Sequence, residues 1–208
     1  MTHHDPAAEN QQSAIEHWNQ VYGEKDQMWS GQPNAALVHA LSGHASGTAL
    51  DVGCGEGGDA VWLAEQGWTV TAIDVSTTAL ERAAAAADAR GVGSQIDWQQ
   101  IDLTEAMPAG EFDLVSAIFL QSRINFPRED ILKSLTRNVA PGGLFLVVGH
   151  AEWPPWARAA EHEHDRPVLH NAIETLTFLD LDSETWDVLI CADQSREATS
   201  PDGESAEL

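Results

Sequence analysis

Hydrophobic and polar positions follow two alternating periods along most of this chain. Short apolar runs of strand length occupy residues 48–52, 69–73, 95–101, 112–120 and 144–150. Between them, apolar residues recur at helical spacing over residues 59–67, 77–90 and 128–139. Strands that alternate with helices in this way predict a parallel sheet covered by helices on both faces.

The two ends of the chain carry weaker patterns. Residues 1–12 are polar and are expected to be disordered, whereas helical spacing returns at residues 15–22 and in a short helix opened by Pro33. After residue 150 the alternation stops. The remaining pattern predicts a lid or insertion over residues 151–167, a helix over 168–179 and a sixth strand over 186–198.

These patterns together predict a single α/β domain over residues 13–197, built on a doubly wound, mostly parallel sheet. The acidic tail, residues 198–208, shows no further strand pattern. A length of 208 residues is sufficient to bury a core without disulfides or structural metals.

Charge and composition narrow the possible partners. The chain has 10 basic and 33 acidic residues and a net charge of −23, which repels nucleic acid and anionic membranes, so neither is expected as a partner. Its two cysteines, Cys54 and Cys191, lie in unlike contexts and predict no disulfide. No apolar run reaches membrane-spanning length and the N-terminus lacks a signal-peptide pattern, so we expect a cytoplasmic protein. The sequence does not indicate the oligomeric state.

A glycine-dense loop follows the first predicted strand. Four glycines lie within residues 53–58, where the chain must turn sharply and a ligand can approach the backbone. The next helix begins at this loop, with Asp59 expected to cap its first turn, so its first N–H groups point into the space that the glycines leave open. The second strand then ends at Asp74, a position that suits a carboxylate accepting hydrogen bonds from a ribose.

The loop alone does not identify its ligand. Gly53, Gly55 and Gly58 satisfy the Gly-x-Gly-x-x-Gly pattern, a weak signal shared with dinucleotide-binding dehydrogenases. Asp51, two positions before the first glycine, argues against that class because a carboxylate there would face a pyrophosphate. It suits a cationic or amine-bearing ligand instead.

Five ordered landmarks over residues 45–150 resemble the class I S-adenosylmethionine-dependent methyltransferases. They are Asp51-x-Gly53-x-Gly55-x-Gly57, Asp74, Asp102-Leu103, Phe112-Asp113-Leu114-Val115 and Pro141-Gly142-Gly143. The resemblance implies a Rossmann-like sheet of six to seven strands, S-adenosylmethionine as cofactor and in-line methyl transfer to a small molecule. The sequences of residues 17–34 and 53–68 resemble methyltransferases of the thiopurine and tellurite-resistance type. In that type an N-terminal helix and loop, here residues 13–44, cover the cofactor.

The resemblance also assigns residues to the methionine end of the cofactor. It places Asp51 and the backbone of Ala117 near the methionine amine. The backbone from Gly53 through Cys54 to Gly55 would follow the methionine and ribose, with Cys54 as a small packing residue rather than a nucleophile. Tyr22 and Trp29 would cover the sulfonium, where an aromatic face stabilises positive charge by about 0.5–2 kcal/mol.

Four further residues are assigned to the adenosine end. Asp74 would bind the ribose hydroxyls, Val75 and Leu103 would sandwich the adenine, and Asp102 would accept a hydrogen bond from the exocyclic amine of the adenine.

The methyl acceptor is expected at the same edge of the sheet. His150 ends the fifth strand and is a candidate base or a structural residue. Gln121 and Arg123 follow the fourth strand, where they either contact substrate or cap local structure. Trp153 and Trp156 either line an apolar substrate pocket or anchor a lid.

Two other functions stay open on the sequence, and a metal site is not expected. One is a non-catalytic S-adenosylmethionine-binding domain that regulates or assembles with a partner, and the other is an NAD-dependent oxidoreductase. The acidic and histidine-rich tract at residues 161–165 is typical of a solvated surface and has no spaced partner ligands.

Overall fold

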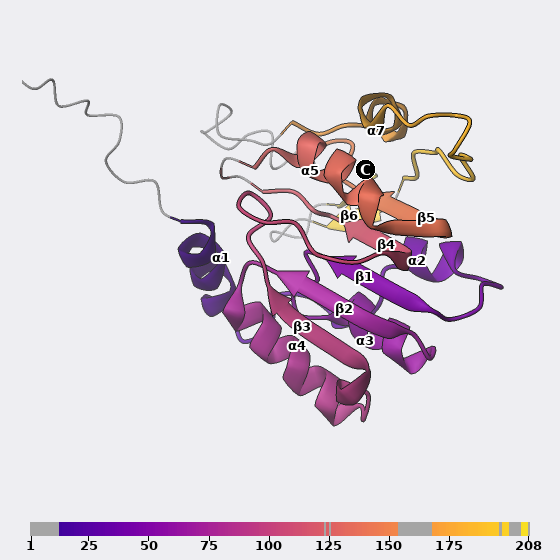
Figure 1. The fold of residues 1–208 in the computed structure, drawn as a ribbon. Coiled ribbons are helices and arrows are strands. Elements are labelled where there is room, and N and C mark those ends of the chain that lie inside the picture. Colours follow the sequence, from indigo (N-terminus) through magenta and orange to yellow (C-terminus); the bar gives the residue numbers. More distant parts are fainter. Residues whose placement is uncertain are drawn as a thin grey trace, which may run out of the picture.

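Five parallel strands form the sheet at the centre of the computed structural model (Figure 1). The structure describes residues 13–122, 124, 126–153 and 168–195, and the backbone of residues 197–199 and 205–207. The sheet has the order β3-β2-β1-β4-β5. Its strands are β1 (Thr48–Val52), β2 (Thr69–Asp74), β3 (Ile96–Gln100), β4 (Phe112–Ile118) and β5 (Val139–Val148).

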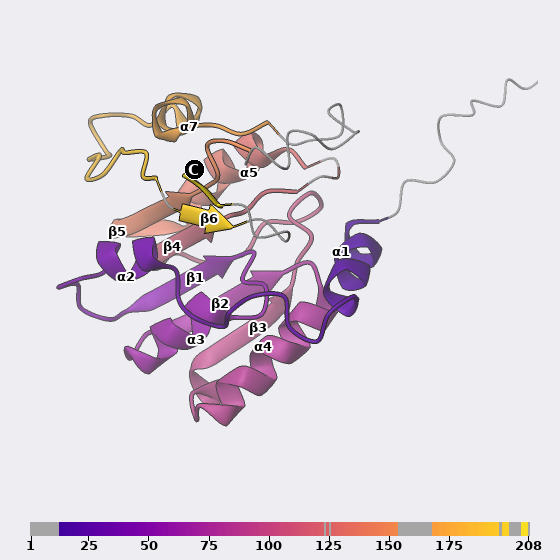
Figure 2. The ribbon, with the colours of Figure 1, turned by 180° about the vertical axis from the view of Figure 1, so that it is seen from behind.

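Helices cover both faces of this sheet, as the sequence predicts. The described helices are α1 (Ala14–Gly23), α2 (Ala35–Ala40), α3 (Gly58–Glu65), α4 (Thr77–Ala89), α5 (Arg128–Leu135) and α7 (Ala172–Leu179), with short 3₁₀ helices η2 (Gly93–Gln95) and η3 (Thr136–Asn138). One core cluster joins α2, α3 and α4 to the sheet, and α2 and α3 lie in front of it in Figure 2. A second core cluster joins α5 and α7 to the opposite face.

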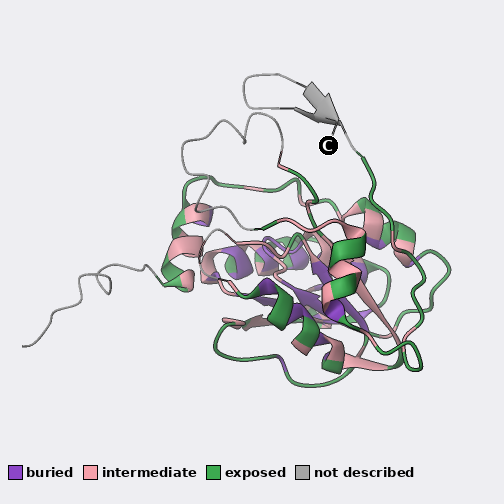
Figure 3. Cartoon of the chain, turned by 90° about the horizontal axis from the view of Figure 1, so that it is seen from above, coloured by how far each residue is buried: buried purple, intermediate pink, exposed green. Residues whose placement is uncertain are grey.

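Alternate residues of each central strand supply the two clusters. In β1, Ala49 packs into the first cluster, whereas Leu50 and Val52 pack into the second. All three side chains are buried, and Figure 3 shows burial concentrated in the sheet and in the helix faces turned toward it. Continuous burial on both faces explains why these strands read as unbroken apolar runs.

The strand order places a crevice at the carboxyl edge of the sheet. The chain runs outward from β1 through β2 to β3 and then returns to β4, which pairs with the free side of β1. In open α/β sheets, ligands bind outside the carboxyl ends of the strands where the winding reverses. Here that point lies between the glycine loop after β1 and the turn after β4.

The C-terminal part of the fold differs from the prediction. Residues 186–195 form no strand, and β6 (Glu197–Thr199) pairs antiparallel with β7 (Ser205–Glu207) in a separate sheet. The main sheet in the described part of the chain therefore has five strands rather than six to seven, and the tail does contain a strand. The apolar run at residues 188–190 is 53–71% exposed, because no described segment covers the two faces that such a run needs to bury.

Two local predictions were also wrong. Helix α3 begins after Gly57 with no side-chain cap, and the Asp59 carboxylate instead accepts a hydrogen bond from the backbone N–H of Asn34. The strand predicted over residues 144–150 begins earlier, because Pro141-Gly142-Gly143 lies within β5, where the register to β4 shifts. Trp62 and Trp98 are partly buried and pack against the first core cluster.

Helix α2 offers a test of the first core cluster. Leu37 is fully buried in it, whereas its neighbour Val38 is 39% exposed. We expect Leu37→Ala to lower the free energy of unfolding by about 2–5 kcal/mol through lost burial and a cavity. Val38→Ala is the matched control and should change it by less than about 0.5 kcal/mol. Urea denaturation measures both, and equal effects would contradict the assigned packing.

Candidate active site

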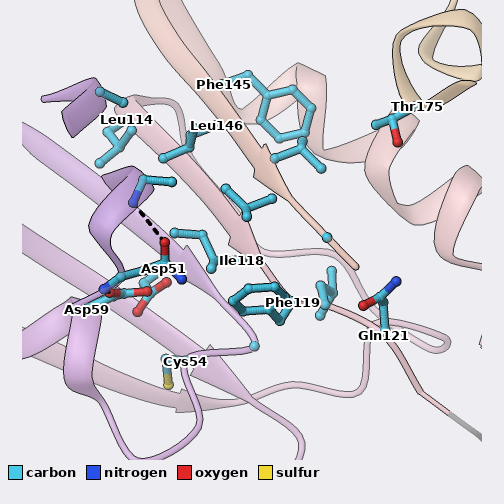
Figure 4. Close-up of a pocket in the computed structure, with 18 of the residues that line it drawn as sticks. Asp51, Cys54, Asp59, Leu114, Ile118, Phe119, Gln121, Phe145, Leu146 and Thr175 are labelled. Atoms are coloured by element: carbon cyan, nitrogen blue, oxygen red, sulfur yellow. Dashed lines mark hydrogen bonds between the residues drawn. The ribbon is translucent and has the colours of Figure 1, made fainter. Parts of the chain in front are cut away.

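A cavity of about 2220 Å³ runs along the carboxyl edge of the sheet. It is lined by the glycine loop, by the ends of β2, β4 and β5 and by the segment between α1 and α2, and it continues along β5 to residues 185–195. Figure 4 shows part of it, with Asp51, Cys54 and Asp59 at one side and Phe119 and Gln121 beyond. A typical ligand pocket is about 300–1,000 Å³, so this cavity has room for a cofactor and an acceptor together.

Neighbouring side chains occupy the positions where Cβ atoms would lie if Gly53 and Gly55 carried side chains. Gly53 and Gly55 have φ of 69° and 53°, which glycine adopts without strain. A Cβ atom on Gly53 would lie 2.7 Å from Leu120 Cδ1, and one on Gly55 would lie 2.9 Å from the Tyr22 hydroxyl oxygen. The loop therefore presents backbone to the cavity and packs closely against both sides of the crevice.

The two predicted cover residues lie on this loop. The Trp29 indole N–H donates a hydrogen bond to the Tyr22 hydroxyl at 3.4 Å, and that hydroxyl contacts Gly55. Tyr22 is buried, and this burial together with the charge of Asp74 raises the pKa of its hydroxyl. A neutral Tyr22 and an exposed Trp29 thus border the cavity above the loop.

Helix α1 and the segment that joins it to α2 form a cover over the glycine loop. Glu56, whose role was not predicted from the sequence, holds this cover in place. One of its carboxylate oxygens accepts hydrogen bonds from the backbone N–H groups of Met28 and Trp29, both at 2.9 Å. The other oxygen accepts from Arg82 Nη1 at 2.9 Å, so a buried carboxylate joins the cover, the loop and helix α4. The available signal was a single charged residue among the glycines of residues 53–58.

Asn19 fixes the other end of the cover. Its Oδ1 atom accepts hydrogen bonds from Ser76 Oγ at 2.8 Å and from the backbone N–H of Thr78 at 3.2 Å. Helix α1 is thereby attached to the first turn of α4, directly after Asp74. This contact was also missed, since an asparagine within a helix gives no indication of a partner so far along the chain.

Asp51 is a buried carboxylate with one unsatisfied oxygen. Its side chain is 2% exposed, Oδ1 accepts a hydrogen bond from Ser116 Oγ at 3.2 Å, and Oδ2 has no partner among the described residues. Burial raises the pKa of Asp51 well above its ordinary value and the charge of Asp59 raises it further. A buried carboxylate without a counter-ion is costly, and a cationic ligand would relieve that cost.

Asp74 is oriented by backbone N–H groups. Its two oxygens accept hydrogen bonds from Gly55 N and Ser76 N, both at 2.9 Å. Burial raises its pKa, while these N–H groups act in the opposite direction. Each carboxylate oxygen has a second lone pair, and Asp74 lines the cavity, so it can also accept from a ligand hydroxyl.

The residues expected at the adenine lie further along the same wall. Val75, Asp102 and Leu103 all line the cavity. One oxygen of Asp102 accepts hydrogen bonds from Thr104 N and Thr104 Oγ1, at 2.9 and 2.7 Å. Ala117 is fully buried within the sheet, and the cavity is lined instead by the residues that follow it, from Ile118 to Ser122.

Two of the expected acceptor residues, Gln121 and His150, follow β4 and β5 and line the cavity. The Gln121 side chain donates from Nε2 to the His150 carbonyl and accepts from the His150 N–H, at 3.3 and 3.2 Å. The His150 ring stacks on Phe119, a residue that the sequence analysis did not single out. Trp153 is half-buried at the end of a described range, whereas Arg123, Trp156 and the tract at residues 161–165 lie outside the described residues.

In Cys54, burial and the charges of Asp74 and Asp51 raise the pKa of the thiol, which keeps it protonated and disfavours a nucleophilic role.

No group of three potential metal ligands gathers anywhere in the described ranges. Every helix in the same ranges is too short or too polar to span a membrane.

Residues 49–143 match a protein family described as a methyltransferase domain. Over this segment the chain is similar in sequence to the class I S-adenosylmethionine-dependent methyltransferases. The matched residues include the cavity-lining glycine loop, Asp74 and Asp102.

Among its relatives is the 2-heptyl-1-hydroxyquinolin-4(1H)-one methyltransferase of Mycobacteroides abscessus, 32% identical over 134 residues, which cover 61% of this chain and 58% of that protein. Another is the methyltransferase GfsG of Streptomyces halstedii, 34% identical over 114 residues, which cover 53% of this chain and 40% of GfsG. The chain thus spans about half the length of these relatives.

Two solved structures share the methyltransferase fold over most of the chain. One comes from work on the conversion of a disulfide bond into a thioacetal group during echinomycin biosynthesis, with a TM-score of 0.68, 27% identity and coverage of 93% of this chain and 88% of that one. The other is TehB from Haemophilus influenzae, with a TM-score of 0.67, 15% identity and coverage of 91% and 63%. The likeness to TehB is one of fold.

The Glu56 contacts predict a defect in cofactor binding. In Glu56→Gln the ion pair to Arg82 is lost and the cover is held less firmly, so the affinity for S-adenosylhomocysteine should fall about 10- to 100-fold, as expected for hydrogen bonds to a charged group. Glu65→Gln is the control, because Glu65 forms a half-exposed ion pair with Arg90 at 3.4 Å. Isothermal calorimetry measures both affinities. An unchanged affinity in Glu56→Gln would contradict the role of Glu56 in holding the cover.

Asp51 predicts a pH dependence of binding. Because burial raises its pKa, ionised Asp51 accumulates only above the ordinary carboxyl range, and the affinity for the amine-bearing S-adenosylhomocysteine should increase as the pH is raised. Asp51→Asn should flatten this increase and weaken binding at pH 8 by about 10- to 100-fold. The exposed Asp97, outside the cavity, provides the control variant Asp97→Asn. A wild-type pH profile retained in Asp51→Asn would assign the effect to Asp59 or Asp74 instead.

Proposed function

We propose that the protein transfers the methyl group of S-adenosylmethionine to a small-molecule acceptor. The observation that carries this proposal is the buried Asp51 carboxylate, whose Oδ2 atom lacks a partner among the described residues, beside a loop that has glycine at four of its six positions. A cofactor with an ammonium and a sulfonium group suits such a site, whereas a pyrophosphate does not.

In this proposal, the residues of the chain bind and orient S-adenosylmethionine. Asp51 faces the methionine amine, Asp74 binds the ribose, and Asp102 together with Val75 and Leu103 holds the adenine. Tyr22 and Trp29 close the site from the N-terminal side and exclude water. When bound, S-adenosylmethionine supplies an electrophilic methyl group, so catalysis then depends mainly on holding the acceptor about 3–3.5 Å from it.

The charge of the protein favours a small acceptor over nucleic acid. Relatives include a ribosomal RNA small subunit methyltransferase C from Chromohalobacter salexigens, 30% identical over 130 residues that cover 38% of it. In this chain the net charge is −23 and acidic residues line the cavity, which disfavours a polyphosphate. The relative from Mycobacteroides abscessus is named for a small hydroxylated heterocycle.

His150 is the proposed base for an acceptor that carries a hydroxyl. It follows β5 and lines the cavity, and its ring stacks on Phe119. A thiolate or chalcogen oxyanion, as expected for the thiopurine and tellurite-resistance type, is already a nucleophile and needs no base. A hydroxyl must lose its proton as the new bond forms, and the imidazole would take it.

The function is tested by an acceptor screen that monitors release of S-adenosylhomocysteine across thiols, chalcogen oxyanions, phenols and amines. Turnover of one of these classes would support a methyltransferase. S-adenosylhomocysteine binding without turnover of any class would favour a non-catalytic cofactor-binding domain.

The role of His150 predicts different effects on different acceptors. His150→Phe keeps an aromatic ring at this position but removes the base, so kcat for a hydroxyl acceptor should fall about 10²- to 10⁴-fold. Turnover of a thiol measured above the pKa of that thiol should change little. Equal losses for both acceptors would show that His150 acts through structure rather than as a base.

A further inference from the structure

Phe119 has an unusual backbone conformation for an aromatic residue. Its φ is 53°, and across the described part of the chain only Asp180 among the other non-glycine residues also has a positive φ. Aspartate tolerates this region because its short side chain can hydrogen-bond locally, whereas a bulky residue there is strained. Strain of this kind persists only where surrounding contacts enforce it, and it concentrates at functional sites.

A set of hydrogen bonds enforces the turn at residues 119–121. The Phe119 N–H donates to the Val148 carbonyl at 2.8 Å, and the Phe119 carbonyl accepts from the Gln121 N–H at 2.8 Å. Arg128 Nε donates to the Leu120 carbonyl at 2.9 Å. With the Gln121–His150 pair, these bonds attach the turn to the end of β5 and to helix α5.

The enforced turn directs the Phe119 ring into the cavity. The ring stacks on His150 with centroids 4.4 Å apart and planes inclined by 24°. It is 38% exposed and lines the cavity. Leu120 contacts Gly53, so Phe119 lies next to the loop that is proposed to hold the reactive end of the cofactor, and Figure 4 shows it between the loop and Gln121.

We propose that Phe119, held against His150, is the platform on which the methyl acceptor stacks, and that the acceptor is a planar aromatic or heteroaromatic molecule with a reactive hydroxyl or thiol. This inference rests on the proposed methyltransferase function and adds the class of substrate. An aromatic face favours a flat π-system over a saturated one of equal size, because stacking adds to the gain from buried area. A saturated acceptor would gain little from a strained phenylalanine at this position.

Two thiols that differ only in ring saturation test the proposal. Phenylmethanethiol and cyclohexylmethanethiol are compared through S-adenosylhomocysteine release, each corrected for its fraction of thiolate. We expect the wild-type protein to favour the aromatic thiol in kcat/KM by about 2- to 12-fold, the size of an aromatic stacking contribution. In Phe119→Leu, which keeps an apolar side chain, KM for the aromatic thiol should rise by this factor with little change in kcat, and the preference should vanish.

Two further variants separate stacking from structure. Phe119→Tyr retains the ring and should restore the preference. Phe178→Leu disrupts a second phenylalanine–histidine contact, with His170 at 5.2 Å, and Phe178 does not line the cavity, so the preference should remain. S-adenosylhomocysteine affinity should stay within about twofold of wild type in Phe119→Leu. If that variant does not fold, the wild-type preference and Phe119→Tyr decide the matter.

Several outcomes would overturn the platform. These are equal turnover of the two thiols by the wild-type protein, a preference that survives Phe119→Leu, and failure to methylate either thiol by a protein that binds S-adenosylhomocysteine. A protein that does not bind S-adenosylhomocysteine at all would instead overturn the proposed function.

Discussion

The close approach of four segments to one glycine loop is the constraint on which the rest of the site depends. Where a side chain would begin on Gly53, Gly55, Gly57 and Gly58, the structure has Leu120, Tyr22, Trp98 and the backbone of Gln32 within 3 Å. The turn after β4, helix α1, the segment between α1 and α2, and strand β3 all converge there. Because the loop carries so little of its own side-chain volume, these segments can approach it and still leave backbone exposed to a ligand.

Two buried acids beside this loop have opposite roles because their partners differ. Glu56 is fully engaged, with backbone N–H groups of the cover on one oxygen and Arg82 on the other, so it contributes to structure. Asp51 retains an oxygen without a partner among the described residues and has a raised pKa. Because buried charges are normally paired, the unpaired oxygen of Asp51 is the basis for proposing a ligand contact there, whereas Glu56 is already paired.

Local sequence signals predicted the sheet, the loop and Asp51 because each is encoded within a few residues: an apolar run, a glycine cluster and an acid at fixed spacing. The bond between Glu56 and Arg82 and the bond between Asn19 and Ser76 were missed, because the two residues of each pair lie 26 and 57 positions apart in the sequence. The strain at Phe119 was missed because no residue pattern there predicts a positive φ. The strand predicted over residues 186–198 was wrong for a related reason: an apolar run indicates burial, but the covering surface must come from elsewhere in the fold.

The central proposal is that the glycine loop, together with Asp51 and Asp74, binds a cation-bearing S-adenosyl cofactor rather than a dinucleotide. Calorimetric titration of the wild-type protein at pH 8 with S-adenosylhomocysteine and, in parallel, with NAD tests this claim most directly. We predict saturable one-to-one binding of S-adenosylhomocysteine and no heat from NAD at the same concentrations. Binding of NAD without binding of S-adenosylhomocysteine would contradict the account.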